Sequence, residues 1–330
     1  MKSNENILLS IICRSYNGEK YIYSALKSLS ETLNDNCEVI IVDNGSTDNT
    51  ISVIKKFLDK EKYFFKAKLV EQNNSGPGGS SNSGLDNVSG KYLGFLDCDD
   101  VYLEIFKSKI IKILEHEELD ILEYGFLVFS EDIKSKKNKY KSLYKNLNGK
   151  YSTESVLDKI FARTNWYPFT RIFRTELWKN IRFPLFKAYE DDMTLYKVFL
   201  KSKSIFIINE PAIGYRNHST SITASHTTKQ LFDLISFYWE LDIEKKYKNI
   251  FQLRLARAIS HFSYELNEGK DEYKKILENQ KKVKFTLKSI IILKNLDKFY
   301  YFFPKIYDLV NFIRLSFVLK LKKKIKKIKS

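Results

Sequence analysis

The sequence contains few cysteines and no long apolar run. Its three cysteines, Cys13, Cys37 and Cys98, are odd in number and lack the spacing of a metal site, which indicates a reducing compartment. No apolar stretch reaches the ~20 residues that a membrane-spanning helix needs. The apolar run at 7–13 is short and is followed by Arg14 without a small-residue cleavage pattern, so we expect no signal peptide.

The sequence also lacks a complete nucleotide-binding glycine motif. A Walker lysine motif is absent. The run Gly76-x-Gly78-x-x-Ser81 comes close to the dinucleotide fingerprint, and Asp97 follows at roughly the expected distance. However, this run follows the third predicted strand rather than the first, and it ends in serine. We therefore interpret its glycines as a loop that allows close backbone approach.

Positive charge is concentrated at the C-terminal end of the chain. The 330 residues, enough for one large domain or two, carry a net charge of +16. Residues 311–330 contain Arg314, seven lysines and no acid. This charge indicates that the segment binds a polyanionic surface, either phospholipid or nucleic acid. Because apolar residues precede the lysine block at 320–329, we expect an interfacial anchor on an anionic membrane leaflet. The alternative is a solvated basic tail on an ordinary helix.

The first hundred residues alternate between strand and helix patterns. Apolar runs at 7–13, 38–42, 68–70 and 92–96 predict four strands. Helices are predicted at 19–33, from cap residues at 46–48, and near 80–88, after a glycine-rich loop at 75–79. This order predicts an α/β fold with a Rossmann-like, mostly parallel sheet and helices on both faces.

Polar side chains follow these strands where the strands end. Asp97 and Asp99 follow the strand at 92–96, residues 14–17 follow the first strand, and Asp43 with Asn44 follow the second. Ligands in such sheets bind beyond the carboxyl ends of the strands, so we expect one shared nucleotide site. Neighbouring carboxylates are costly unless a cation lies among them, and a divalent cation holding phosphate oxygens would relieve that cost. An isolated D-x-D pair is also consistent with a solvated acidic turn.

Five sequence blocks resemble glycosyltransferase family 2, the inverting nucleotide-sugar enzymes of the GT-A fold. The blocks are SIICRSYNGEKYI, EVIIVDNGSTDNT, FLDCDD, FPLFKAYEDDMTLYKV and YRNHSTSIT. They follow the family's order from residue 10 to about residue 223. The resemblance implies a GT-A fold, a nucleotide-sugar donor, a divalent cation (Mn²⁺ or Mg²⁺) and a bacterial surface-polysaccharide type of enzyme.

The resemblance assigns donor binding to the ends of the first two strands. By this likeness, Tyr16 stacks on or flanks the nucleobase, with Ser15 and Asn17 shaping its pocket. Asp43 and Asn44 would contact the base and the ribose. The alternative for Tyr16 is a capping aromatic at a strand end.

The resemblance places the metal and the diphosphate at the acidic turn. Asp99 is the expected direct metal ligand, while Asp97 reaches the ribose or a metal-bound water. Arg216 and His218 would stabilise the departing nucleoside diphosphate, with His218 close to the diphosphate or the metal. A lone histidine in a loop is also consistent with simple packing.

Two positions depart from the family pattern. Many relatives have aspartate where this chain has Asn44, and an arginine near the position of Ser81. Both positions are associated with base recognition, which leaves the nucleobase open. We expect a uridine diphosphate sugar, with a thymidine diphosphate sugar as the alternative.

An acidic run near residue 190 supplies the expected general base. The family match assigns Asp191 as the base that deprotonates the acceptor hydroxyl, with Glu190 and Asp192 in support. Acidic residues at this place are also consistent with capping of the helix that follows. Trp166 and Trp178 are interpreted either as sugar-stacking surfaces or as core residues.

The resemblance implies a metal-assisted, inverting hexosyl- or N-acetylhexosaminyltransferase that extends a capsule, lipooligosaccharide, teichoic acid or exopolysaccharide. Its GT-A domain would span residues 1–227, with a nucleotide-binding half at 1–100 and an acceptor half at 101–227. A helical region with the basic tail would occupy 228–330. We expect a cytoplasmic protein on the inner face of the membrane. The alternatives are a non-catalytic nucleotide-sugar- or membrane-binding protein and, least favoured, a nucleic-acid-binding protein.

Overall fold

Four parallel strands form the first half of a central sheet. The structure is a computed structural model that describes residues 7–218, except 136, 143, 145 and 163–165, together with isolated positions between 233 and 251. The strands lie in the order β3-β2-β1-β4. Ile11, Val39 and Phe95 on the inner three are fully buried, as expected for strands covered on both faces. Their bounds are β1 (Leu9–Ser15), β2 (Cys37–Asp43), β3 (Lys66–Glu71) and β4 (Tyr92–Asp97).

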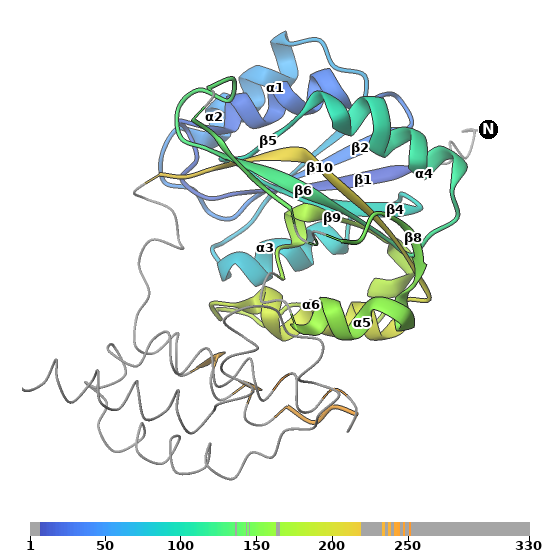
Figure 1. Ribbon diagram of the computed structural model, residues 1–330. Coiled ribbons are helices and arrows are strands. Elements are labelled where there is room, and N and C mark those ends of the chain that lie inside the picture. Colours follow the sequence, from blue (N-terminus) through green and yellow to red (C-terminus); the bar gives the residue numbers. More distant parts are fainter. Residues whose placement is uncertain are drawn as a thin grey trace, which may run out of the picture. The chain divides into compact units, whose positions relative to one another are not determined.

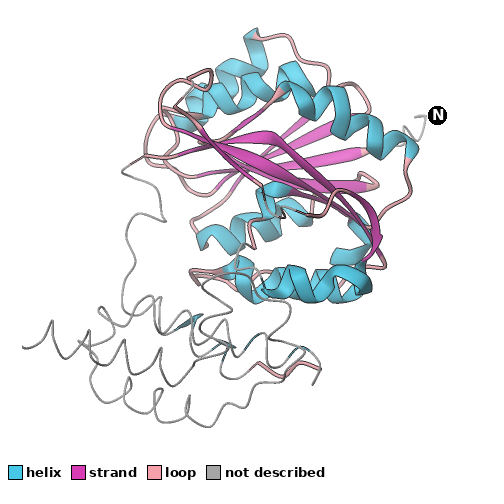
Figure 2. Ribbon diagram, viewed as in Figure 1, coloured by secondary structure: helices cyan, strands magenta, loops and turns pink. Residues whose placement is uncertain are grey.

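Helices cover both faces of this sheet (Figures 1 and 2). One face carries α1 (Ile22–Thr32), α2 (Thr50–Lys60) and α4 (Lys112–His116), and the other carries α3 (Gly76–Leu85) and α6 (Glu190–Lys201). Helix α1 buries its apolar side chains at spacings of three and four, as predicted. The α/β architecture expected from the sequence is therefore confirmed.

The glycine-rich segment at 75–79 is not the loop expected from its composition. Helix α3 begins at Gly76, and Pro77 occupies its first turn, where a missing N–H costs nothing. A β-carbon on Gly78 would collide with the carbonyl oxygen of Pro184. The glycines do allow close backbone approach, but the approaching backbone belongs to the segment before α6.

The second half of the sheet is mixed. The full order is β3-β2-β1-β4-β9-β6-β10-β5, with β6 parallel to β10 and β9 antiparallel to both β4 and β6. The sequence predicted a mostly parallel sheet, and parallel pairing is found in the first half of the sheet and in the β6–β10 pair. The strands are β5 (Val101–Tyr102), β6 (Ile121–Phe129), β7 (Lys139–Lys141), β8 (Gly149–Ser152), β9 (Arg171–Arg174) and β10 (Ser204–Arg216). The remaining helical segments are η1 (Phe106–Ile111), α5 (Thr153–Ala162), η2 (Pro168–Thr170) and η3 (Thr175–Trp178).

The chain divides into two units, residues 1–157 with 164–237 and residues 158–163 with 238–330. Within the second unit, the Phe161 ring packs edge-on against Tyr247 and Phe251 at centroid distances of 5.0 and 5.1 Å. The predicted helical region at 228–330, including its basic tail, lies outside the described residues apart from isolated positions. The boundary at residue 227 stays a prediction. No helix in the described part of the chain is long and apolar enough to cross a membrane.

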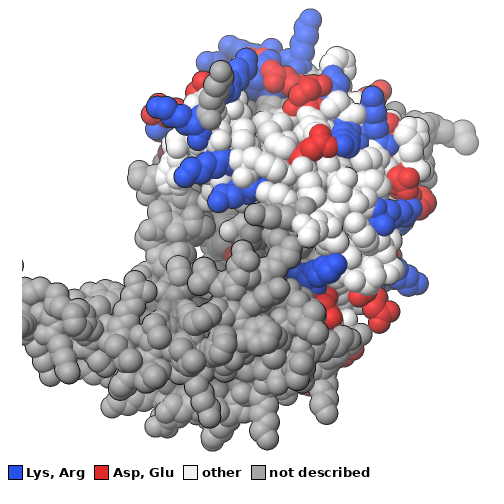
Figure 3. Space-filling model, in the orientation of Figure 1, with Lys and Arg blue, Asp and Glu red and all other residues white. Residues whose placement is uncertain are grey.

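The surface face in Figure 3 shows basic and acidic side chains interspersed over the described part of the chain. A nucleic-acid-binding surface would instead gather Lys and Arg into a patch or stripe. This face therefore gives no support to the nucleic-acid alternative.

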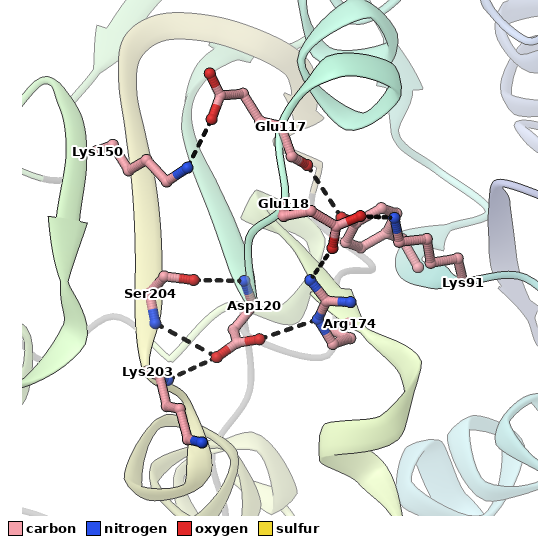
Figure 4. A network of polar contacts seen from close by, with 9 residues as sticks. Lys91, Glu117, Glu118, Asp120, Lys150, Arg174, Lys203 and Ser204 are labelled. Atoms are coloured by element: carbon pink, nitrogen blue, oxygen red, sulfur yellow. Dashed lines mark hydrogen bonds and ion pairs between the residues drawn. The ribbon is translucent and has the colours of Figure 1, made fainter.

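A polar network closes the edge at which β4, β6 and β10 begin (Figure 4). Arg174 donates from Nε to Asp120 Oδ1 at 3.0 Å and from one terminal nitrogen to Glu118 Oε2 at 2.7 Å. Asp120 Oδ2 also accepts the Lys203 N–H at 2.6 Å, and Glu118 pairs with Lys91. Hydrogen bonds from Lys91 and Arg174 lower the pKa of Glu118 to about 2. Since the acidic turn lies at the opposite ends of these strands, we infer that this network stabilises the fold and takes no part in the site.

Candidate active site

Hydrogen bonds join the turns that follow β1 and β2. Asn17, at a φ of 48°, donates its backbone N–H to Ser46 Oγ at 2.9 Å and accepts the Thr47 N–H at 2.8 Å. Asp43 accepts the Ser46 N–H at 3.0 Å and the Ser46 hydroxyl at 2.6 Å. Tyr16 is 47% exposed, so its ring is accessible to a ligand. The polar ends of these two strands therefore meet, as expected for a parallel pair.

Ser15 and Asn44 are buried beneath these turns, and the Asn44 N–H donates to the Ser15 carbonyl at 2.8 Å. The Asn44 amide oxygen accepts from Gln72 Nε2 at 2.8 Å and from the Ser75 N–H at 3.1 Å. Its amide nitrogen donates to the Gly76 carbonyl at 3.2 Å. Asn44 therefore bonds at both ends of its amide within the protein and holds the backbone that leads into α3.

Three carboxylates gather in the turn after β4. Asp97 and Asp99 are partly exposed, whereas Asp100 is buried and accepts the Arg216 N–H at 2.8 Å. Burial and then the neighbouring Asp97 charge raise the pKa of Asp99. Burial and then the Asp99 charge raise the pKa of Asp100 well above the usual range. Charged carboxylates are thus costly here without a cation.

The end of β10 reaches this acidic turn. His218 Nε2 lies 2.8 Å from Asp99 Oδ2. Arg216 donates from Nε to the Asp99 carbonyl at 2.9 Å, and its guanidinium lies over the rings of Phe129 and Tyr21 at 4.4 and 5.0 Å. The structure thus joins Asp99, Arg216 and His218. The Arg216 guanidinium meets backbone carbonyls and aromatic rings, whereas the backbone N–H of Arg216 binds the Asp100 carboxylate.

The first turn of α6 carries the acidic run. Tyr189, just before the helix, has a φ of 61°. This is a left-handed backbone conformation, which residues other than glycine adopt at a cost in free energy. Glu190 is buried, and the Asp192 N–H donates to Asp191 Oδ1 at 2.9 Å. Burial and then the Asp192 charge raise the pKa of Asp191 well above the usual range. A carboxylate with a raised pKa is a stronger base, which suits proton abstraction near neutral pH.

Arg14 connects the acidic turn with α6. Its Nε and one terminal nitrogen donate to Asp97 Oδ1 at 2.9 and 2.6 Å. The other terminal nitrogen donates to Ser81 Oγ at 3.0 Å and lies 3.6 Å from Glu190 Oε1. Arg14 was expected at these strand ends as one of residues 14–17, without a role of its own. A usable signal was present, because a charged residue at the end of a buried apolar run needs acidic partners.

The residues at the acidic turn fit a divalent cation only in part. Among the described residues, no group of three or more His, Cys, Asp or Glu side chains is arranged to hold a metal ion. Asp99 and His218 nevertheless place a carboxylate oxygen and an imidazole nitrogen 2.8 Å apart. Mg²⁺-type sites often take one or two carboxylates and complete their shell with substrate phosphates and water. The donor set therefore fits a cation that arrives with a diphosphate.

Both tryptophans considered for sugar stacking lie in the core. Trp166 is 1% exposed and packs edge-on against Phe199 at 5.4 Å. Trp178 is 3% exposed and stacks on Phe183 at 5.2 Å. Their alternative interpretation, core packing, is confirmed.

Comparisons with known proteins find glycosyltransferases among the relatives of this chain. Glycosyltransferase GlyA of Streptococcus pneumoniae is 26% identical over 239 residues, covering 69% of this chain and 33% of GlyA. The poly(ribitol-phosphate) beta-N-acetylglucosaminyltransferase TarS of Staphylococcus aureus is 28% identical over 276 residues, covering 79% of this chain and 45% of TarS. The chain thus spans only a third to a half of the length of these relatives.

Solved structures show the same fold. TarS residues 1–349 in complex with UDP-GlcNAc superpose with a TM-score of 0.65 at 20% identity, covering 92% of this chain and 89% of that one. The mannosyltransferase PcManGT of Pyrobaculum calidifontis, in complex with GDP-Man and Mn²⁺, gives 0.53 at 14% identity, covering 84% and 80%. The expected GT-A fold is confirmed. Residues 10–188 match the model of glycosyl transferase family 2, and the chain belongs to that family.

Proposed function

We propose that the protein transfers a sugar from a nucleotide diphosphate sugar to a hydroxyl group of a growing glycan, with inversion at the anomeric carbon. One observation carries the proposal: Arg14 lies 2.6 Å from Asp97 and 3.6 Å from Glu190. The acidic turn and the first turn of α6 are thereby held at one centre. Such a transfer needs a leaving diphosphate and a base for the acceptor at the same place.

The nucleoside would bind at the ends of β1 and β2. Tyr16 offers an accessible ring for the base, and Asn17 and Asp43 hold the turns around it. Ser15 and Asn44 support these turns from below. Because TarS binds UDP-GlcNAc, we favour a uridine diphosphate hexose or N-acetylhexosamine, with a thymidine diphosphate sugar as the alternative.

The diphosphate would bind at the acidic turn. Asp99 and His218 would hold a Mn²⁺ or Mg²⁺ ion, with Asp97 contacting the ribose or a water on the ion. When bound, the ion neutralises charge that grows on the leaving diphosphate. Arg216 adds fixed positive charge beside Asp99 and would favour the same charge build-up.

The acceptor would be activated by Asp191. As the oxygen of the acceptor hydroxyl forms a bond to the anomeric carbon, the bond from that carbon to the diphosphate oxygen breaks. The hydroxyl proton passes to the Asp191 carboxylate, and the nucleoside diphosphate leaves with the electron pair. Attack opposite the leaving group turns an α-linked donor into a β-linked product.

The acceptor class follows from the relatives rather than from the site. TarS acts on poly(ribitol-phosphate) by name, so we propose a bacterial surface glycan, either capsule, lipooligosaccharide, teichoic acid or exopolysaccharide. We further propose that residues 311–330 attach the protein to the inner face of the cell membrane. A chain ending at residue 307 should no longer sediment with anionic vesicles, and retained binding would remove the tail from this role.

A panel of nucleotide sugars tests the proposal. Purified protein with Mn²⁺ is incubated with uridine, thymidine and guanosine diphosphate sugars, and free nucleoside diphosphate is measured. We expect release from one nucleotide class, increased by a glycan acceptor. Binding of a nucleotide sugar without any release or transfer would instead favour the non-catalytic binding protein.

A further inference from the structure

We propose that Arg14 is a positioning residue of this site, which orients the Asp97 carboxylate and holds Glu190, the neighbour of the Asp191 base, at the same centre. The inference rests on the proposed function, in which Asp97 serves the donor and Asp191 serves the acceptor. It assigns a role to a residue that the family resemblance left without one.

The contacts of Arg14 are those of a built connection. Its side chain is 11% exposed. In the β1–β4 register it lies opposite Asp97, and its carbonyl accepts the Cys98 N–H at 3.0 Å. Its guanidinium reaches Asp97 twice, Ser81 once and Glu190 at 3.6 Å. Arg14 therefore holds the acidic turn through both its backbone and its side chain.

The two bonds to Asp97 fix the direction of that carboxylate. Both donors meet Oδ1, and no donor from the described residues reaches Oδ2. This oxygen is the one available to the donor ribose or to a metal-bound water. A planar guanidinium sets such geometry in a way that a lysine ammonium cannot. Displacement of a substrate-positioning group by about 1 Å can lower the rate by roughly 10²-fold.

Ser81 indicates where the positive charge would otherwise come from. Ser81 lies on α3 and is fully buried. In the structure the Arg14 guanidinium lies 3.0 Å from the Ser81 hydroxyl. An arginine thus reaches this place from β1 rather than from α3. We infer that residues 14 and 81 are alternative origins for one guanidinium, so the charge can be exchanged between them.

Three variants test the exchange. Arg14→Ala removes the guanidinium, and Arg14→Ala with Ser81→Arg returns it from α3. Arg174→Ala is the matched control, because Arg174 also joins two carboxylates but at the opposite edge of the sheet (Figure 4). We expect Arg14→Ala to lower turnover per folded molecule by about 10²-fold. The double variant should regain at least about a tenth of wild-type turnover. The Arg174→Ala control should have wild-type turnover.

A pH profile distinguishes positioning of the site from general damage. The groups facing Asp191 are Glu190 and Asp192 of its own helix, Arg14, and Tyr167. Arg14 lowers the pKa of Asp191 against burial and the two acids. Its removal should move the acid limb of kcat/KM to higher pH by about one pH unit, and the double variant should move it back.

Two results would overturn the proposal. One is a folded Arg14→Ala variant with wild-type turnover, and the other is a folded double variant as slow as Arg14→Ala with an unmoved acid limb. If Arg14→Ala does not fold, Arg14→Lys takes its place. Lysine keeps the charge but not the fork, so a folded Arg14→Lys variant should lose at least about tenfold in turnover, and full activity would refute the proposal. A wild-type protein without transferase activity would refute the proposed function rather than the role of Arg14.

Discussion

Replacing Asp191 with asparagine should abolish sugar transfer while leaving donor binding intact. The carboxylate lies in the first turn of α6, where its oxygen accepts the Asp192 N–H at 2.9 Å. Asparagine has the same size and keeps this acceptor, but its amide cannot take a proton from the acceptor hydroxyl. A positioned base contributes about 10²–10⁴-fold, so kcat should fall by that factor, or about 3–5 kcal/mol.

The same substitution should stabilise the fold at neutral and higher pH. Burial, and then the Asp192 charge, raise the pKa of Asp191 well above the usual range. The folded protein therefore binds this proton more tightly than the unfolded chain, and stability is lost as pH rises through the raised pKa. Asparagine removes that loss. For a domain of this size, each kcal/mol recovered raises Tm by about 2–4 °C.

The assay combines turnover, binding and melting. Nucleoside diphosphate release gives kcat, calorimetry gives the Kd for the nucleoside diphosphate, and Tm is followed from pH 5 to pH 9. The gain in Tm for Asp191→Asn should grow with pH. Asp59→Asn, the same chemical change on the exposed face of α2, should alter none of the three. Undiminished turnover in a folded Asp191→Asn variant would remove Asp191 from the mechanism, and a pH-independent Tm change would refute the electrostatic argument.

Three further predictions concern Asp192 next to the base, the divalent cation, and the polar network where β4, β6 and β10 begin. Asp192→Asn removes a charge that raises the pKa of Asp191, so the acid limb of kcat should move to lower pH; a limb that moves up would contradict this. EDTA should abolish activity and Mn²⁺ or Mg²⁺ restore it, and Asp99→Asn should raise the Mn²⁺ concentration for half-maximal rate more than about tenfold. Full activity in chelator would exclude the metal. Asp120→Ala, which removes the acceptor of Arg174 Nε and the Lys203 N–H, should lower the free energy of unfolding by about 1–3 kcal/mol in urea titrations. Its turnover per folded molecule should stay at the wild-type value.

The first half of the fold was predictable because its signals are local. Apolar runs such as 92–96 are buried on both sheet faces, and parallel strands bring their carboxyl ends to one edge whatever lies between them. The meeting of the turns after β1 and β2 follows from that rule alone. The grouping of Asp99 with His218 needed the family resemblance, because no sequence spacing relates the end of β10 to the end of β4.

The second half of the sheet depends on pairings that sequence periodicity does not encode. The short strand β9 lies between β4 and β6, antiparallel to both, and each partner is far away in the chain.

The start of helix α3 also could not be predicted from local sequence. Its glycines have poor helix propensity, but tight packing against Pro184 requires residues without side chains, and the tertiary contact overrides the local preference.

Arg14 shows how charge can reveal a site when spacing does not. A guanidinium is always charged, so an arginine at the end of a buried strand must meet carboxylates or leave the chain less stable. The sequence alone therefore required acidic partners, but it contains forty acids and does not say which of them lie near. The fold selects Asp97, the neighbour of Arg14 in strand register, and Glu190, brought in by α6. Asp97 lies close to Asp99 in the chain, and Glu190 directly precedes Asp191. The ion pairs that neutralise the Arg14 charge therefore also bring the two acidic groups of the proposed reaction to one centre.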